Sequence, residues 1–331
     1  MVLELDSKNK YLFEKYNYFK GHIFQSEAYS NLKQIENWHC LVHVDENDVI
    51  DGSMSIFVTN IEGIKATILY SPRGPVCVKD KTVYKEFLDK SYEIGKKYNA
   101  LALKMDPDIS NFDIEYKKML LDLNFNFTKT SSIQSQYVYR LNIEGFTEEN
   151  ILNKLNKKTR YNIKKVLKKD FKVKERSIEY IDEFYNIMKE TGIRKNYDIR
   201  SIDYFKRILT NYKNNAIMYI VYKDDEPICG GITVKNKNMA WCLYAGTKTK
   251  YIQSSPIYLL HYKRILWAIK NGCRVYDLGG SGWENDVLDS MPGVSKFKKQ
   301  FGAELIKFIG GIEYYYKDIN KEFLNWNSFI S

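Results

Sequence analysis

The stretch GCRVYDLGGSGWENDVLDSMPGVSKFKKQFGAELIKFIG (272–310) predicts a strand at 274–278 that runs into a glycine-rich bend at 279–282. Glycines after a strand allow a sharp turn or the close approach of a ligand to the backbone. Further on, the segment 297–302 sets two lysines between two phenylalanines and ends in glycine. Taken alone, the stretch is equally typical of a loop with a solvated turn. Its meaning therefore depends on the rest of the chain.

The predicted strand at 275–278 closes a set of elements that occurs twice along the chain. Each set has three strands, a helix and a last strand, with a polar turn after the first strand. The sets are expected at 37–44, 54–58, 64–70, 79–98 and 101–105, and again at 217–222, 230–235, 239–244, 256–271 and 275–278. Such a repeat predicts a duplicated α/β domain. The element order resembles that of the GNAT acyltransferase fold.

Composition indicates a globular intracellular protein. With 331 residues, 44% hydrophobic and 28% charged, the chain can hold two domains with their own cores. No apolar run approaches the length that crosses a bilayer, and the acidic N-terminus does not resemble a signal peptide. The five cysteines are scattered and form no C-x-x-C pair. These features predict a reduced, cytoplasmic protein without a transmembrane segment.

A strongly basic segment lies between the two sets, at 151–169. Its apolar residues recur near helical spacing, and no acidic residue interrupts its bases. The bases are Lys154, Lys157, Lys158, Arg160, Lys164, Lys165, Lys168 and Lys169. Like charges on one helix repel each other, so this pattern favours a surface that faces phosphates over a merely solvated face. The net charge of +10 is compatible with an anionic partner but does not identify one.

Several kinds of chemistry are not supported by the sequence. There is no Ser-His-Asp pattern and no P-loop, and the group His39, Cys40 and His43 lacks a second pair of ligands, so no metal site is predicted. GNAT acetyltransferases hold coenzyme A with a glycine-containing loop at a helix N-terminus. The corresponding segment here, 253–257, reads QSSPI, in which the glycines are missing and Pro256 removes a donor. A coenzyme A-dependent reaction is therefore the weaker alternative.

Four motifs, in order along the chain, resemble those of the FemABX peptidyltransferases. Gln25-Ser26 with Tyr29 and Lys33 resembles the early QS-x-x-W/Y-x-x-x-K of that family. The segment 70–75, YSPRGP, resembles its Y-x-PRGP, and 158–165, KTRYNIKK, resembles its K-x-R-x-x-I-x-K. The opening stretch resembles its YD-x-GG followed by FK-x-x-FG. Together the motifs span nearly the whole chain.

The resemblance implies a fold and a reaction. It implies tandem GNAT-like domains, one at 1–145 with 314–331 that binds the precursor, and one at 146–313 on the aminoacyl-tRNA side. The expected reaction moves Ala, Gly or Ser from aminoacyl-tRNA to the stem-peptide amine of UDP-MurNAc-pentapeptide or lipid II. No cofactor is expected, because the tRNA ester is already activated. The interval 169–217 is too short for the coiled-coil arm of many members, so the chain resembles the arm-less ones.

The resemblance also assigns candidate site residues for the chemistry. Lys298 matches the lysine of FK-x-x-FG and is expected to stabilise negative charge in the transition state. Phe297 beside it is expected to pack against the terminal adenine. Asp106, at the end of a strand before Pro107, is the candidate for orienting or deprotonating the amine. Asp108 competes with it, and a structural Asp-Pro turn is the other interpretation.

Further candidates are expected to hold the two substrates. Lys33, Arg73, Arg200, Tyr204 and Tyr244 are assigned to the precursor, with Arg200 and Tyr204 one helical turn apart. Core packing is the alternative for each tyrosine, and bracing of a turn is the alternative for Arg73. The tRNA is assigned to the basic segment, through Lys157, Lys158, Arg160, Lys164 and Lys165.

The predicted function is thus an arm-less, cytoplasmic aminoacyltransferase of cell-wall bridge synthesis, with a peripheral contact with the inner membrane face left open. Two alternatives remain. One is a coenzyme A-dependent N-acyltransferase, and the other is a non-catalytic basic protein that binds RNA or a membrane surface. The amino acid, the lysine or diaminopimelate acceptor and the oligomeric state are not determined by the sequence.

Overall fold

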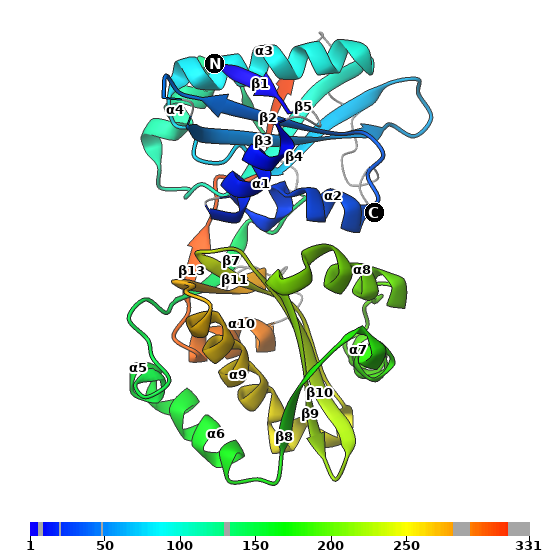
Figure 1. Ribbon diagram of the computed structural model, residues 1–331, viewed down its shortest axis with the longest axis vertical. Coiled ribbons are helices and arrows are strands. Elements are labelled where there is room, and N and C mark those ends of the chain that lie inside the picture. Colours follow the sequence, from blue (N-terminus) through cyan, green and yellow to red (C-terminus); the bar gives the residue numbers. More distant parts are fainter. Residues whose placement is uncertain (6–8, 20, 48, 129–132, 281–291, 317–331) are drawn as a thin grey trace. The chain divides into compact units, whose positions relative to one another are not determined.

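A computed structural model describes residues 1–5, 9–19, 21–47, 49–128, 133–280 and 292–316 (Figure 1). The chain divides into two compact units, Met1–Gln136 with Lys307–Ser331 and Tyr137–Ile306. The division precedes residue 145, where the sequence set it, because the strand at 137–142 pairs within the second sheet. Each unit is an α/β body with its own sheet, as the repeat predicted.

The first unit contains a seven-stranded sheet in the order β1-β2-β3-β4-β5-β14-β6. Its strands are β1 (Val2–Glu4), β2 (Trp38–Val44), β3 (Ile50–Asn60), β4 (Thr67–Arg73), β5 (Ala100–Pro107), β6 (Asn126–Phe127) and β14 (Ile312–Tyr315). Its α-helices are α1 (Lys10–Phe19), α2 (Glu27–Lys33), α3 (Lys81–Lys97) and α4 (Ile114–Asp122). Only β4 and β5 are parallel neighbours, since α3 connects them as a crossover.

Helix α3 shows how local sequence builds this unit. Asp80 caps it by accepting hydrogen bonds from the backbone N–H groups of Thr82 and Val83. Its apolar face buries Tyr84 and Phe87, and the neighbouring strand β4 is buried along its whole length. Because β4 pairs with β3 on one edge and β5 on the other, and α3 packs against the sheet, its apolar residues Ile68, Leu69 and Tyr70 are all buried.

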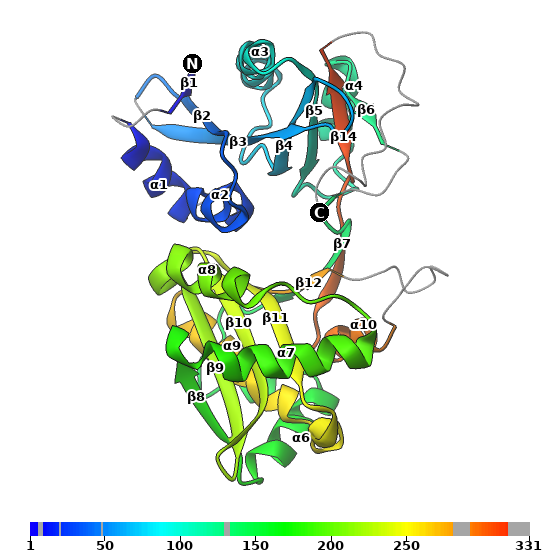
Figure 2. The same ribbon diagram turned by 90° about the vertical axis from the view of Figure 1, so that its right-hand side faces the viewer.

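The second unit contains another seven-stranded sheet, in the order β13-β7-β12-β11-β10-β9-β8. Its strands are β7 (Tyr137–Asn142), β8 (Lys172–Arg176), β9 (Ala216–Lys223), β10 (Glu226–Lys235), β11 (Met239–Thr247), β12 (Val275–Gly280) and β13 (Glu304–Lys307). Its α-helices are α5 (Ile151–Lys154), α6 (Lys157–Leu167), α7 (Ile181–Lys195), α8 (Ile202–Tyr212), α9 (Pro256–Lys270) and α10 (Pro292–Gln300). Figure 2 shows α7 on one face of this sheet and α9 on the other.

Both units therefore repeat three antiparallel strands, a helix and a strand that returns parallel to the third. In the second unit β9, β10 and β11 are antiparallel, α9 follows, and β12 pairs in parallel with β11. This confirms the tandem α/β architecture. The described segment between β8 and β9 holds α7 and α8 and shows no coiled-coil arm, as expected.

Two local predictions differ from the structure. The basic segment was expected to be one helix, but Leu155 is extended and Asn156 caps a new helix, so it divides into α5 and α6. A loop with a solvated turn was one of two interpretations of the stretch that holds 297–302, but Phe297 and Lys298 lie in the last turns of α10. Gly282 and the tail after Tyr316 lie outside the described residues.

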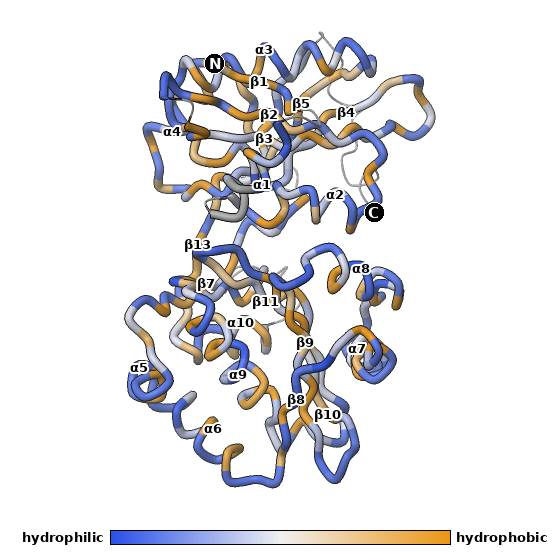
Figure 3. The backbone as a smooth tube through the Cα atoms, in the orientation of Figure 1, coloured by the Kyte–Doolittle hydropathy of each residue, from blue (hydrophilic) through white to orange (hydrophobic). Residues whose placement is uncertain are grey.

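Figure 3 shows how hydrophobic and hydrophilic residues are distributed along the backbone. Apolar residues concentrate in the strands, with a core in each unit. Within the described residues, no helix combines the length and the apolar character needed to span a bilayer.

Candidate active site

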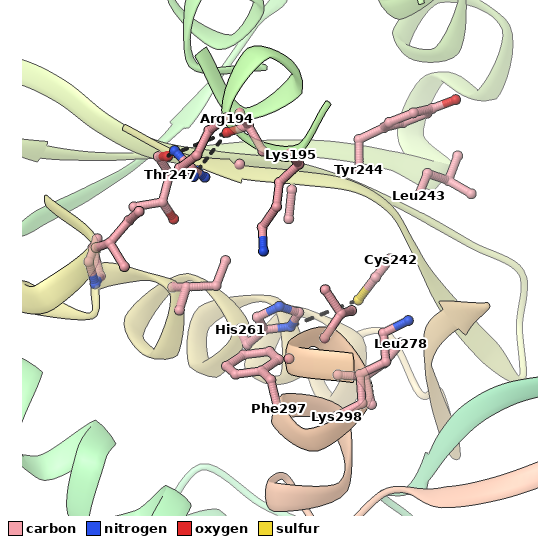
Figure 4. A pocket seen from close by; sticks show the side chains of 18 of the residues that line it. Arg194, Lys195, Cys242, Leu243, Tyr244, Thr247, His261, Leu278, Phe297 and Lys298 are labelled. Carbon is pink, nitrogen blue, oxygen red and sulfur yellow. Dashed lines mark hydrogen bonds between the residues drawn. The ribbon is translucent and has the colours of Figure 1, made fainter. Parts of the chain in front are cut away.

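A cavity of about 620 Å³ opens in the second unit between α7, β11, α9 and α10 (Figure 4). Its position follows from strand pairing. Strands β11 and β12 are paired only over Met239–Trp241 and Val275–Asp277, and the residues just beyond, Cys242 and Leu278, line the cavity. Two parallel strands that stop pairing leave room for a ligand at their carboxyl ends.

Lys298 lies at this opening on the last turn of α10. Its side chain is buried, with 7% of the residue exposed, and Nζ donates hydrogen bonds to the carbonyl oxygens of Gly279 at 3.1 Å and Gly280 at 2.5 Å. Phe297 next to it lines the same cavity. The glycine-rich end of β12 and the FK motif, which are distant in the sequence, thus form one corner.

Gly279 adopts a backbone conformation that few other residues tolerate. Its φ of +83° lies in the left-handed region, so a side chain here would be strained. The conformation is fixed by Asp277, whose Oδ1 accepts a hydrogen bond from the Gly279 N–H at 2.6 Å. Arg140 on β7 donates to the other carboxylate oxygen of Asp277 at 3.0 Å. The YD-x-GG motif therefore shapes the carbonyls that hold Lys298.

His261 forms part of the floor. It comes from α9, and its ring lies 5.3 Å from each of the rings of Phe297 and Phe301, measured between centroids. Its Nδ1 is hydrogen-bonded to the Tyr276 hydroxyl at 2.9 Å. Burial, followed by the positive charges of Arg264 and Lys298, holds the pKa of His261 well below its ordinary range. The imidazole is therefore neutral at neutral pH.

The opposite wall of the cavity is cationic. Arg194 and Lys195, from the end of α7, line it, and Arg194 Nη1 donates to the Thr247 carbonyl at 2.8 Å and to the Thr249 hydroxyl at 3.0 Å. Figure 4 shows the Lys195 side chain directed into the cavity. Among the described residues, no carboxylate lines the cavity. Its electrostatic character favours an anionic ligand.

Three precursor candidates cluster around β11 and α8. The Arg200 guanidinium lies 5.6 Å from the Tyr204 ring centroid, and the Tyr204 and Tyr244 rings are 6.2 Å apart in an edge-to-face arrangement. Tyr244 also lines the cavity, and burial raises its pKa. The structure therefore brings Arg200, Tyr204 and Tyr244 together.

The basic helix α6 is tied directly to α10. Asn156 Nδ2 and the Thr159 hydroxyl both donate hydrogen bonds to the Gln300 carbonyl at the end of α10. The buried side of α6 holds Ile163 and Val166, which leaves its lysines on the surface. We call the exposed lysines of this helix the basic face of α6: Lys157, Lys158, Lys164 and Lys165. Arg160 is only partly exposed and donates to the Asn153 carbonyl at 3.4 Å.

The remaining candidates lie in the first unit. Asp106 has 1% of its surface exposed, and its carboxylate accepts hydrogen bonds from the Tyr70 hydroxyl and from the backbone N–H groups of Arg73 and Gln134. Burial raises its pKa. Asp108 is more accessible, with 22% of its side chain exposed, and lies 3.8 Å from His22 Nε2. This arrangement supports the structural interpretation of Asp106.

Arg73 is also engaged within the first unit. Its Nη2 donates to the Ser135 carbonyl at 2.6 Å, and its guanidinium lies 4.5 Å from the centroid of the Phe308 ring. These contacts match the bracing interpretation of the Pro-Arg-Gly-Pro turn. Lys33 is partly exposed on the last turn of α2.

The sequence interpretation missed several residues of the cavity. Arg194, Lys195 and His261 line the cavity, and none of them was predicted as a site residue. The repeat of elements was the available signal for these residues. In the second set, the third strand (β11) and the helix after it (α9) line the cavity. Among the described residues, no cluster of His, Cys, Asp and Glu could hold a metal ion.

Comparison with known proteins places this geometry in context. The sequence model of the FemAB family matches residues 9–120, 123–226 and 221–326. A lipid II:glycine glycyltransferase of Staphylococcus epidermidis is 22% identical over 366 residues, which cover 89% of this chain and 88% of that protein. A crystal structure of FemX superposes with a TM-score of 0.85 at 18% identity, covering 95% of this chain and 97% of that one. A tandem GNAT protein from the clavulanic acid biosynthesis pathway gives 0.57 at 8% identity, covering 97% and 99%.

Proposed function

Since the chain belongs to the FemAB family, we propose that it transfers an amino acid from aminoacyl-tRNA to the side-chain amine of a peptidoglycan stem peptide. The observation that carries the proposal is the acid-free cavity with Lys298 anchored at the end of β12. The acceptor is UDP-MurNAc-pentapeptide or lipid II. The naming of relatives as lipid II:glycine glycyltransferases supports a precursor of this class.

The proposed donor is a tRNA charged with Ala, Gly or Ser. Two surfaces of the second unit support a polyanionic donor whose aminoacylated end enters the cavity. Arg194 and Lys195 give the cavity wall positive charge, and the basic face of α6 offers further phosphate contacts. The hydrogen bonds from Asn156 and Thr159 to Gln300 connect that face to the helix that carries Lys298.

The chemistry requires positioning more than a strong catalyst. The neutral amine attacks the ester carbonyl, a C–N bond forms, the C–O bond to the ribose breaks, and the amine proton goes to the departing ribose oxygen. Lys298 is assigned to stabilise the negative charge that develops on the carbonyl oxygen, because a buried cation acts strongly where water is excluded. No cofactor takes part, since the ester already carries the activation energy.

The experiment is a transfer assay with labelled alanyl-, glycyl- and seryl-tRNA, each offered with UDP-MurNAc-pentapeptide and, separately, with lipid II. A branched product with one tRNA is expected. Replacing Lys298 by Met is expected to lower kcat by roughly 10²–10³-fold, while the same change at Lys296, exposed on the same helix, leaves the rate unchanged.

The outcomes separate two claims. Absence of product with both acceptors and all three tRNAs would refute the proposed function. Full activity of Lys298→Met would refute only the role of that lysine. Acetyl-coenzyme A as the sole donor serves as the control for the coenzyme A-dependent alternative.

A further inference from the structure

The floor of the cavity contains a histidine that the transfer chemistry described above does not use. His261 is 5% exposed and is packed against the rings of Phe297 and Phe301 from α10. Leu278 and Ile257, which also line the cavity, are apolar. A polar ring in such surroundings is costly to bury unless its nitrogens find partners. One of the two nitrogens has such a partner in the protein.

Contacts to Nδ1 set the orientation of the His261 ring. The fully buried Tyr276 hydroxyl is hydrogen-bonded to Nδ1 at 2.9 Å, and the Cys242 sulfur lies 4.0 Å from the same nitrogen. Nε2 has no hydrogen-bond partner among the described residues, and in Figure 4 it points toward the cavity on the side of Lys195. One nitrogen is therefore used for positioning and the other faces the space where a ligand would lie.

The groups around the ring keep it uncharged. Arg264 comes from its own helix, Lys298 from α10, Tyr276 from β12 and Cys242 from β11. The two cations disfavour an imidazolium, and neither the tyrosine nor the thiol supplies a negative charge at neutral pH, because burial raises the pKa of both. Arg264 is fully buried and forms no ion pair with a described carboxylate. A neutral imidazole suits an uncharged donor or acceptor on the ligand better than a phosphate.

The wall on the α7 side carries two cations, whereas the floor combines a neutral imidazole with one cation that two backbone carbonyls hold. Arg194 and Lys195 line the wall on the α7 side, whereas the neutral His261 lies on the floor beside Lys298 (Figure 4). A ligand with phosphates at one end and an ester at the other matches this arrangement in one orientation, with the phosphates toward α7. The ester end then lies over the floor.

We propose that His261 is a binding residue for the donor, whose Nε2 hydrogen-bonds an uncharged group at the ester end of aminoacyl-tRNA, the ester carbonyl or a hydroxyl of the terminal ribose. The inference rests on the proposed function and adds a contact to the donor half of that site. Tyr276 is a positioning residue, which acts through the orientation of the ring.

The test compares three substitutions in the full-length protein. His261→Gln places an amide group near the position of Nε2, His261→Asn reaches only the position of Nδ1, and His261→Phe keeps the aromatic packing without a polar atom. We expect Phe and Asn to lower kcat/KM for charged tRNA by about tenfold or more, and Gln to stay within a few-fold of wild type. The KM for the precursor should not change in any of them.

A second measurement separates contact from packing. In His261→Phe the Tyr276 hydroxyl loses its hydrogen-bond partner, and this loss could itself lower kcat/KM. The Tyr276→Phe variant and the double variant His261→Phe/Tyr276→Phe measure this contribution separately from the lost contact with the ligand. In wild-type protein labelled with ¹⁵N in histidine, the Nε2 resonance of His261 should shift when a non-hydrolysable amide analogue of aminoacyl-tRNA is added. A purely structural histidine would not respond in this way.

Each result supports or overturns the inference. The inference is overturned if His261→Phe has the kcat/KM of the wild type, or if the Nε2 resonance does not shift when the analogue is added. Either result leaves the proposed function intact. Equal losses in the Gln and Phe variants show a packing role and overturn it as well. If the wild-type protein transfers no amino acid from any tRNA, the proposed function fails and this inference fails with it.

Discussion

Acidification is expected to destabilise the second unit through His261. In the folded protein the pKa of this residue is held well below its ordinary value of about 6.5 by burial and by Arg264 and Lys298. When the pH falls below this ordinary value, His261 in the unfolded chain binds a proton that His261 in the folded chain does not. The stability is therefore fully present above the unfolded pKa and is lost as the pH falls.

The size of the effect follows from this difference. Because the folded-state pKa of His261 lies well below that of the unfolded chain, lowering the pH from about 7 to about 5.5 removes about 1 kcal/mol of folding free energy through this one group. Other titrating groups add their own contributions. The informative quantity is therefore the difference between wild type and a variant in which His261 alone no longer titrates.

Urea unfolding at the two pH values, followed by tryptophan fluorescence, measures that difference. Trp241 and Trp267 both lie in the second unit and report on it. His261→Gln should lose about 1 kcal/mol less stability than wild type on acidification. Equal losses in the two proteins would refute the reasoning, because they would mean that His261 accepts its proton equally well in the folded state.

Three further predictions concern other parts of the molecule. Gly231→Ala should destabilise the protein by roughly 1–3 kcal/mol in urea unfolding, because its Cβ would lie 2.8 Å from Arg264 Nη1 and 2.8 Å from the Tyr244 carbonyl; wild-type stability would contradict this packing argument. Asp106→Asn should cost about 1–3 kcal/mol of stability, since an amide cannot accept all the hydrogen bonds of the carboxylate, while the rate of transfer is retained. Loss of transfer in a stably folded Asp106→Asn protein would instead support the catalytic hypothesis. Replacing the basic face of α6 by glutamine should reduce the salt dependence of tRNA binding in filter-binding titrations, and an unchanged slope would exclude those lysines from the interface.

The start of α9 differs from the helix start that binds coenzyme A in GNAT acetyltransferases. In a GNAT acetyltransferase, backbone N–H groups of a glycine-containing loop before the helix hold a pyrophosphate. Here α9 begins at Pro256 after Ser255, which adopts a left-handed conformation, and no side chain caps the helix. Positive charge comes from side chains on α7 and α10 instead. The cavity beside the ends of β11 and β12 therefore lacks the glycine-containing loop of those enzymes and is lined by cationic side chains.

The buried guanidinium of Arg264 lowers the stability of the fold. Arg264 is fully enclosed, donates to the Thr233 hydroxyl and to the Ile232 carbonyl at 2.6 Å, and its Nη1 has no hydrogen-bond partner among the described residues. A buried charge without a counter-ion opposes folding. Gly231 leaves the space that this guanidinium occupies. The positive charge of Arg264 adds to burial in lowering the pKa of His261.

The sequence alone determined the architecture of both units. The twofold succession of strands and a helix is written in local patterns, since alternation and helical periodicity depend on neighbours in the chain. The same holds for the basic segment, whose charges are local facts, and for the motif that carries Lys298. These features could be predicted because each depends on residues within a few positions of one another.

Only the tertiary structure decided how the site is assembled. Lys298 is held by carbonyls of Gly279 and Gly280, and His261 is oriented by Tyr276, through contacts between elements that are separate in the sequence. The burial of Asp106 was likewise not predictable from local sequence, because whether a carboxylate meets solvent or three donors depends on segments such as the one that holds Gln134. Local sequence specifies which groups are present. Their distances, and with them their charge states, are set by long-range packing that no local pattern encodes.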